Sequence, residues 1–187
     1  MVSRTRVGEL VQGVVSGLNR GLVASKDDVQ KADAAAKEIE GVREPIDLHK
    51  MRGWWKLRYC SAFSSQSAIA MPDHVTIGEV FQRIDILSKD FDNIVNLEYT
   101  GPEPGKKIDK FAHKLELIGS SKVKLTYDSS KSQHNSQAPW AILDALRPAA
   151  KTGSSTEFEV TYLDADTLTT RGDGNKLSVF SLRSHGL

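Results

Sequence analysis

Beyond its first quarter, the chain alternates apolar and polar residues in short runs, the pattern of strands that bury one face. In the first run, Trp55, Leu57 and Tyr59 share one face, while Lys56 and Arg58 take the other. The later runs with similar alternation cover residues 79–85, 93–99, 111–118, 122–127 and 157–162. The pattern therefore predicts a succession of half-buried β-strands.

Residues 162–182 contain two turn signals in close succession. Residues 163–166 and 172–175 are rich in Asp, Asn and Gly, which accept positive φ or bond their own backbone at low cost. These signals divide the stretch into three short extended runs, a closing meander. Because five β-prone runs precede it, we expect about eight antiparallel strands, and sheets of that size tend to close into barrels.

The start of the chain has helical spacing instead. Apolar residues between Val7 and Gly17 recur on one face, which predicts a docked helix. Ser25 and the acidic residues after it predict the N-cap and first turn of a second helix. We therefore expect a mainly β fold, in which a helical segment of residues 1–48 packs its two helices outside a barrel formed by residues 49–187.

The alternation stops between Asp128 and Thr156, where Ser, Gln, Asn, Lys and Gly predominate. We interpret this part as an irregular insertion, 128–156, in the barrel. It contains one apolar island in which three side chains can share a helical face: Trp140, Leu143 and Leu146. If they are exposed, these residues would favour contact with a membrane or a partner protein.

Composition narrows the possible partners. The 25 Lys and Arg residues balance 24 Asp and Glu residues, and the signs are interspersed, so nucleic acid is not an expected partner. The single cysteine, Cys60, excludes an internal disulfide. No apolar run approaches the roughly 20 residues of a membrane-spanning helix. The five histidines stand singly, and no glycine loop or nucleophile motif occurs, so we expect no metal, cofactor or catalytic residue.

The predicted apolar faces include four residues with polar groups: Tyr59, Gln82, His113 and Tyr162. Such groups need partners if they are buried in a dry core, and they suit a cavity that orients a ligand. The alternative is a filled barrel, in which Gln82 bonds a loop and the tyrosines point out of the barrel ends. Sequence alone leaves both alternatives open, because an eight-stranded barrel can be filled or hold one small ligand.

Several motifs resemble those of the plastid lipid-associated proteins, or plant fibrillins. They are Leu-Asn-Arg-Gly-Leu from Leu18, Gly-x-Trp-x-Leu-x-Tyr from Gly53, Gln82-x-Ile84-Asp85, and Tyr-Leu-Asp from Tyr162 followed by Arg-Gly-Asp-Gly from Arg171. The resemblance covers most of the chain, and its last pair of motifs is the most specific. It implies a lipocalin-like barrel whose relatives bind or handle prenylquinones, carotenoids or fatty acids at plastoglobules and thylakoids.

On these grounds we predict a protein that binds, stores or carries a small hydrophobic molecule without catalysis. Gln82 and His113 would orient its head group, and Arg171 or Arg183 would stack on Trp55 to seal one end of the barrel. The other side chains expected to line the interior are Leu57, Tyr59, Ile84, Leu115, Leu125, Val160 and Tyr162.

Two rival functions remain at this stage. The first is an interaction module that stabilises an enzyme of isoprenoid or quinone synthesis, or coats lipid droplets. The second is an enzyme acting on a bound lipid, and His113 is the only sequence feature that favours it. The resemblance implies a plastid location (plastoglobule, thylakoid or stroma) or a cyanobacterial-type equivalent, and the opening residues suggest that this chain carries no transit peptide.

Overall fold

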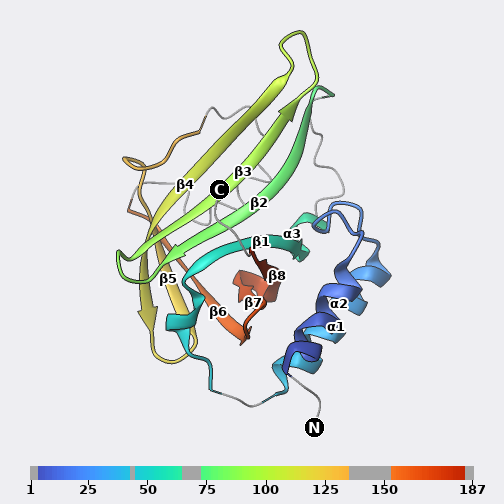
Figure 1. Ribbon diagram of the computed structural model, residues 1–187, viewed down its shortest axis with the longest axis vertical. Helices are drawn as coiled ribbons and strands as arrows, with labels where there is room; N and C mark the ends of the chain where they lie inside the picture. The colour runs from blue at the N-terminus through green and yellow to red at the C-terminus, as the bar shows by residue number, and fades with distance from the viewer. Residues whose placement is uncertain (1–3, 43–44, 65–72, 135–152, 184–187) are drawn as a thin grey trace.

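The computed structural model describes residues 4–42, 45–64, 73–134 and 153–183. Its strands form one closed barrel in which chain neighbours pair antiparallel and β1 pairs with β8 (Figure 1). The strands are β1 Gly53–Cys60, β2 Val75–Asp85, β3 Asp90–Tyr99, β4 Gly105–Ile118, β5 Lys122–Tyr127, β6 Ser155–Leu163, β7 Thr167–Gly172 and β8 Lys176–Leu182. The prediction of an antiparallel barrel of about eight strands is confirmed.

Strands β2, β3 and β4 extend beyond the rest of the barrel, toward the top of Figure 1. β2 begins at Val75 and β4 at Gly105, before the predicted starts at residues 79 and 111. Both extensions pair with β3, where Val75 and Gly105 each lie opposite Tyr99. Alternation missed these residues because backbone pairing holds them in strands although Gly78 and consecutive lysines interrupt the pattern.

Two helices, α1 (Arg4–Val15) and α2 (Lys26–Glu40), lie side by side on one flank of the barrel, as predicted (Figure 1). Ser25 is the predicted N-cap of α2. Its hydroxyl accepts a hydrogen bond from the Asp28 backbone N–H, and the Asp28 carboxylate accepts one from the Ser25 backbone N–H. The described residues also form short helices: η1 (Leu48–Met51) before β1, α3 (Ser61–Ser64) after β1, and η2 (Asp173–Asn175) between β7 and β8. No helix in the described ranges is long and apolar enough to cross a membrane.

The loop between α1 and α2 fastens both helices to β1. Asn19, Arg20 and Gly21 have positive φ values of 46°, 60° and 100°. The Arg20 carbonyl accepts a hydrogen bond of 3.0 Å from the backbone N–H of Cys60. A Cβ atom at position 21 would lie 2.5 Å from the Cys60 carbonyl oxygen, so glycine is required for this close approach. The Asn-Arg-Gly motif therefore has a structural role.

The buried apolar residues form two clusters. The interior cluster fills much of the barrel, and it includes Trp55, Phe91, Phe111 and Phe180. The helix-facing cluster lies between the outer wall and the helices. Its members are Val11, Val15, Ala32, Ala36, Ile39, Tyr59, Tyr162, Leu177 and Val179. Burial of both clusters stabilises the fold, and the second attaches the helices to the barrel.

Two β-bulges turn Tyr59 and Tyr162 away from the interior, which corrects the prediction that both line it. The β1–β8 register shifts between Leu57 and Tyr59, and the β6–β7 register shifts between Val160 and Tyr162. One extra residue reverses the alternation of a strand, so side chains beyond the bulge face the opposite side. Both tyrosines consequently belong to the helix-facing cluster.

Arg171 also lies outside the barrel, where it joins β7 to α2. Its Nε donates to Glu40 Oε1 at 2.8 Å, one terminal nitrogen donates to Glu40 Oε2 at 3.1 Å, and the other donates to Asp33 Oδ1 at 2.8 Å. The side chain is 10% exposed. Arg171 is therefore a fastener between the barrel and α2, and its prediction as a ligand-binding residue is corrected.

The predicted stack of an arginine on Trp55 is also wrong. Trp55 points into the barrel, and its indole Nε1 donates to the Met51 carbonyl at 2.8 Å. The guanidinium carbon of Arg183 lies 5.1 Å from the centre of the Phe81 ring instead. Trp55 precedes the bulge and so keeps its inward phase, whereas Phe81 belongs to the outer face of β2.

Candidate functional site

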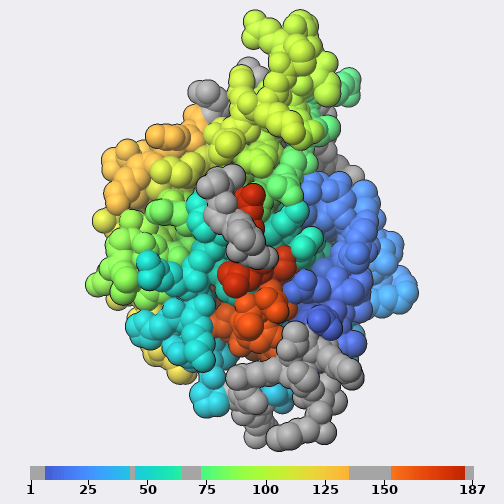
Figure 2. Space-filling view, in the orientation of Figure 1, coloured from blue at the N-terminus to red at the C-terminus, as the bar shows by residue number. Residues whose placement is uncertain are grey.

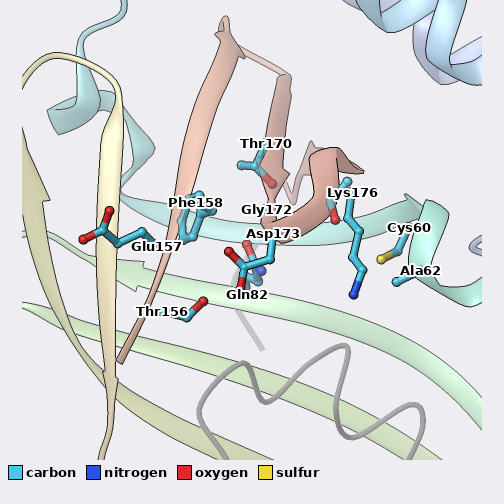
Figure 3. A pocket seen from close by; sticks show the side chains of 11 residues that line it. Cys60, Ala62, Gln82, Thr156, Glu157, Phe158, Thr170, Gly172, Asp173 and Lys176 are labelled. Carbon is cyan, nitrogen blue, oxygen red and sulfur yellow. The ribbon is translucent and has the colours of Figure 1, made fainter. Parts of the chain in front are cut away.

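A cavity of about 190 Å³ opens where the ends of several strands meet. Strands β1, β2, β6, β7 and β8 contribute to its wall, together with α3 and η2 (Figure 3). The lining residues are Cys60, Ala62, Gln82, Thr156, Glu157, Phe158, Thr170, Gly172, Asp173, Lys176 and Ser178. Residues far apart in the sequence thus meet around one hollow.

The inward faces of β6, β7 and β8 change from apolar to polar toward this cavity. Thr170 of β7 lies opposite Ser178 of β8, and Thr156 of β6 lies opposite Leu125 of β5. One step further along the same faces stand apolar members of the interior cluster: Val160, Leu168 and Phe180. The cavity therefore has hydroxyl groups at its wall and a packed apolar core next to it.

Several polar side chains at the cavity keep free hydrogen-bonding capacity. Gln82, Thr156 and Thr170 make no side-chain hydrogen bond to another residue within the described ranges. Thr170 is only 7% exposed, although it faces the cavity. An amide and two hydroxyls both donate and accept hydrogen bonds, so this wall can receive a carbonyl, hydroxyl or ester group.

The rim of the cavity is charged and is formed by the turn between β7 and β8. Gly174 and Asn175 have positive φ values of 66° and 62°, as the Gly-Asp-Gly-Asn turn signal requires. The turn leaves Asp173 and Lys176 exposed at the edge. Glu157 belongs to the outward phase of β6, because it pairs with Lys124 on β5. The rim thus carries charges of both signs.

Cys60 reaches the cavity because it follows the bulge in β1. Alternation from Tyr59 predicted the outward phase for it, but the shifted register pairs Cys60 with the inward Ser178. Burial raises the pKa of the Cys60 thiol, while a hydrogen bond with Ser178 acts in the opposite direction. The thiol therefore stays protonated near neutral pH and is a poor nucleophile.

Six of the predicted lining residues lie in the interior cluster: Trp55, Leu57, Ile84, Leu115, Leu125 and Val160. Each is at most 3% exposed. They pack against one another, and none lines the cavity at the strand ends. Contact of these six residues with a ligand stays a prediction.

Gln82 and His113 were expected to act together on a head group, but they occupy different environments. Gln82 lines the cavity. His113 is 2% exposed and does not line the cavity. Phe158 of the wall has its ring centre 6.1 Å from that of Phe91, which in turn lies 6.0 Å from the His113 ring. Ring contacts through Phe91 therefore connect His113 to Phe158, and His113 itself is not among the residues that line the cavity.

Burial lowers the pKa of His113, and backbone groups of Phe111 and Phe91 offset this only in part. Neither imidazole nitrogen has a hydrogen bond of normal geometry. The ring packs edge-on against Tyr127, with centres 5.5 Å apart. His113 is thus a neutral member of the aromatic core near neutral pH and not part of the cavity wall.

The membrane or partner residues Trp140, Leu143 and Leu146 lie outside the described residues, so that hypothesis stays a prediction. The turn at Asp164 follows the expected Asx chemistry. Its Oδ1 accepts hydrogen bonds from the backbone N–H groups of Asp166 and Thr167 at 2.8 and 2.7 Å. Within the described ranges, no cluster of His, Cys, Asp or Glu could hold a metal ion.

Sequence reasoning missed most of the cavity wall. Thr156 and Phe158 share the alternation of Val160, and that phase was a usable signal for both. Thr170 and Ser178 flank the turn at equal distance from it, which could have paired them. Cys60 had no such signal, because a bulge is not visible in the alternation.

The sequence itself matches a known family. A family model described as PAP_fibrillin matches residues 7–181. The chain belongs to this family. The plastid lipid-associated fibrillins are the group that the sequence motifs predicted, and the match extends from α1 to the end of β8. It therefore includes the helices, the barrel and the cavity residues.

A curated fibrillin relative is plastid-lipid-associated protein 6, chloroplastic, from Arabidopsis thaliana. The two chains are 45% identical over 189 aligned residues, which cover 89% of this chain and 66% of the relative. The chain thus spans just under two thirds of that protein. Among solved structures, an uncharacterized protein from Bacteroides eggerthii DSM 20697 matches 71% of this chain and 98% of its own, with 14% identity and a TM-score of 0.38.

Proposed function

We propose that this fibrillin binds a small hydrophobic molecule with a polar head group and does so without catalysis. The observation that carries the proposal is the cavity at the strand ends, where Gln82, Thr156 and Thr170 offer unused hydrogen-bonding groups beside an apolar core. Ligand pockets combine apolar walls with a few polar groups that fix orientation.

The cavity size indicates which part of the ligand enters. Its volume of about 190 Å³ is below the roughly 300–1,000 Å³ of pockets that enclose drug-sized molecules. A ring-sized head group fits that space, whereas a prenyl or acyl chain must extend past Phe158 and the rim. Prenylquinones suit an arrangement with the ring in the cavity and the chain outside it, because carbonyl oxygens on the ring can accept hydrogen bonds from Gln82 and Thr170. Carotenoids and fatty acids are the other candidate classes of ligand.

The chemistry of the wall favours binding over turnover. The cavity contains hydroxyl groups, an amide and the buried Cys60 thiol, whose raised pKa makes a thiolate scarce. His113, the one residue that suggested catalysis in the sequence, is buried and is not among the residues that line the cavity. These features support storage, shielding or carriage of the bound molecule.

The relative supports a plastid setting. Its name describes a chloroplastic plastid-lipid-associated protein. For this chain we propose the same compartment, with plastoglobule or thylakoid lipid as the source of the ligand. A ligand whose tail leaves the cavity would remain in contact with a lipid surface during loading.

Filling the cavity tests the proposal. Thr170→Leu adds apolar volume at the wall and removes one hydroxyl, while Thr76→Leu makes the same change on an exposed position of β2. We expect decyl-plastoquinone, measured by titration calorimetry, to bind Thr170→Leu at least about tenfold more weakly than the wild type, a loss near 1.4 kcal/mol. Thr76→Leu should bind like the wild type.

Circular dichroism must show that both variants are folded. Mass spectrometry of lipids extracted from protein purified from its own source identifies the natural ligand. Equal affinity in the two variants, or no lipid above the level of a control purification, would contradict the proposal.

A further inference from the structure

A second hollow lies on the outer wall of the barrel, between α1 and β1. We call it the α1–β1 groove, and it has a volume of about 640 Å³. Figure 2 shows the blue helices against the cyan of β1 on the face toward the viewer. The residues that define the groove are Gln12, Gly13, Ser16, Arg20, Lys56 and Arg58. None of them takes part in the barrel cavity.

The groove is strongly basic in a chain whose charges otherwise balance. Arg20, Lys56 and Arg58 line it, and no carboxylate is among its lining residues. A smaller hollow of about 260 Å³ shares Lys56 and Arg58 and adds Arg183 and Glu79. Four cations therefore face one carboxylate, whereas the whole chain has 25 basic and 24 acidic residues. Such a local excess attracts anions.

The single carboxylate neutralises only part of this charge. Glu79 forms a salt bridge with Lys56. Burial lowers the pKa of Arg20, and the attraction of Glu79 offsets the effect only partly. Within the described ranges, neither Arg20 nor Arg58 forms a salt bridge. Two guanidinium groups thus remain without a carboxylate partner at the groove.

The fold fixes these cations in position. Arg58 stands at the bulge of β1, and its Nε donates to the Ser181 hydroxyl at 2.7 Å, which leaves the terminal nitrogens for another acceptor. Arg20 belongs to the loop that fastens the helices, and a terminal nitrogen donates to the Ile77 carbonyl at 2.8 Å. Held guanidinium groups lose little entropy when they bind an oxyanion.

The helix side of the groove supplies space and weaker polar groups. A Cβ atom at Gly13 would meet nothing within 4 Å, so the groove is open there. Gln12 and Ser16 add an amide and a hydroxyl. The C-terminal end of α1 opposes an anion, but this effect is about 0.3–1 kcal/mol and faces three cationic side chains.

We propose that the α1–β1 groove binds a phosphate or sulfate group through Arg20, Lys56 and Arg58. Guanidinium and ammonium groups recognise such oxyanions by charge-assisted hydrogen bonds. The group can belong to an anionic lipid at a membrane surface or to a free ion, and the two sources share the same recognition. This site is on the outer wall, so it is independent of the proposed barrel ligand.

The first test removes the exposed cations. The double variant Lys56→Gln/Arg58→Gln is compared with Lys122→Gln/Lys124→Gln, which removes the same charge from β5 and leaves β1 intact. We expect flotation with phosphatidylglycerol vesicles to weaken about fivefold for each charge removed from the groove. The β5 variant should retain the affinity of the wild type, and phosphatidylcholine vesicles should bind none of the proteins.

The second test keeps every cation and blocks the groove. Gly13→Glu places a carboxylate in the open space, and Gly13→Ala is its control, because alanine suits a helix better than glycine. We expect Gly13→Glu to reduce vesicle binding as the double variant does, while Gly13→Ala binds like the wild type.

Inorganic phosphate distinguishes the two sources. In a titration followed by NMR, shifts of the Arg20 and Arg58 Nε–H signals with phosphate alone indicate a site for the free oxyanion. Vesicle binding without such shifts indicates a lipid headgroup, and both results support the site if the groove variants lose them. Wild-type protein that binds neither probe, or groove variants that bind as their controls do, would overturn the proposal. Quinone titrations of the same variants should be unchanged, so the two proposals can fail separately.

Discussion

The helix–barrel interface and the cavity both contain polar groups next to buried apolar side chains, but the two regions differ in whether those groups have side-chain hydrogen-bond partners. At the interface, the Arg171 guanidinium binds two carboxylates of α2, and the Tyr162 hydroxyl donates to Asp164 at 2.8 Å. At the cavity, Gln82 and Thr170 have no such side-chain partner in the described part of the chain. Both regions are built from the same strands, β6 to β8.

This difference separates structural polar residues from candidate binding residues. A buried polar group without a partner loses about 1–3 kcal/mol, so pairing Arg171 and Tyr162 stabilises the interface. The Tyr59 hydroxyl in the same cluster is an exception, since it has no hydrogen-bond partner among the described residues. Groups that face a hollow can instead be satisfied by water or by a ligand. Pairing together with position at the cavity therefore separates Arg171 and Tyr162, which stabilise the fold, from Gln82 and Thr170, which are available for recognition.

Removal of Arg171 should have the largest effect on the interface. Arg171→Ala leaves Glu40, whose side chain is 17% exposed, without its cation, while Asp33 keeps its salt bridge with Lys37. We expect a loss of about 3 kcal/mol in the free energy of unfolding in urea, because breaking a buried ion pair leaves an uncompensated charge. Affinity for the barrel ligand should not change in the folded protein.

Two variants control this measurement. Arg171→Lys keeps the charge but cannot make the forked contact, so it should recover part of the loss. Lys122→Ala removes an exposed cation from β5 and should stay within about 0.5 kcal/mol of the wild type. If Arg171→Ala is as stable as Lys122→Ala, the contact of Arg171 with α2 does not stabilise the fold.

The residues of these two regions also show which structural features can be predicted from sequence patterns. Alternation identified the strands, the capping signal at Ser25 identified α2, and Leu57 and Val160 took the predicted inward phase. The patterns failed beyond each bulge, because one inserted residue reverses the phase of Tyr59 and Tyr162 without a mark in the composition.

The candidate site was harder to predict than the fold. Gln82 lines the cavity, and its amide in an apolar phase was the sequence signal for it, but its contact with a ligand stays a prediction. The partners of Arg171 lie on a helix more than a hundred residues away, and no local pattern reports such a contact. The cavity wall combines strand ends that meet only after the barrel has closed, so its membership depends on register and not on propensity.

The buried His113 side chain leads to a second prediction, which concerns how the stability of the fold depends on pH. Burial lowers its folded pKa below the ordinary value of 6.5. The unfolded chain therefore takes up a proton at a higher pH than the folded protein. The stability contributed by neutral His113 is present above pH 6.5 and is lost as the pH falls below it, by up to about 1.4 kcal/mol per pH unit.

Urea unfolding between pH 7.5 and about pH 5 measures this slope, above the range in which carboxylates titrate. His113→Phe keeps an aromatic ring and should flatten the curve in that window. The backbone groups of Phe111 and Phe91 and the charge of Asp92 all favour the protonated imidazole, but burial outweighs them and lowers the pKa of His113. An equally steep curve for His113→Phe would show that other groups cause the pH dependence.

The smallest expected effects come from two threonines of β7, which differ only in what they face. The Thr167 hydroxyl accepts a hydrogen bond of 2.7 Å from Gln12 Nε2 on α1, whereas Thr170 faces the cavity. Thr167→Val should cost about 1 kcal/mol, because Gln12 loses its shorter hydrogen bond and keeps only the 3.4 Å bond to the Asp166 carbonyl, while Thr170→Val should change stability little. In ligand titrations the order reverses: Thr170→Val weakens binding of decyl-plastoquinone and Thr167→Val does not. The same order in both measurements would mean that pairing does not separate fold-stabilising from ligand-binding groups in this barrel.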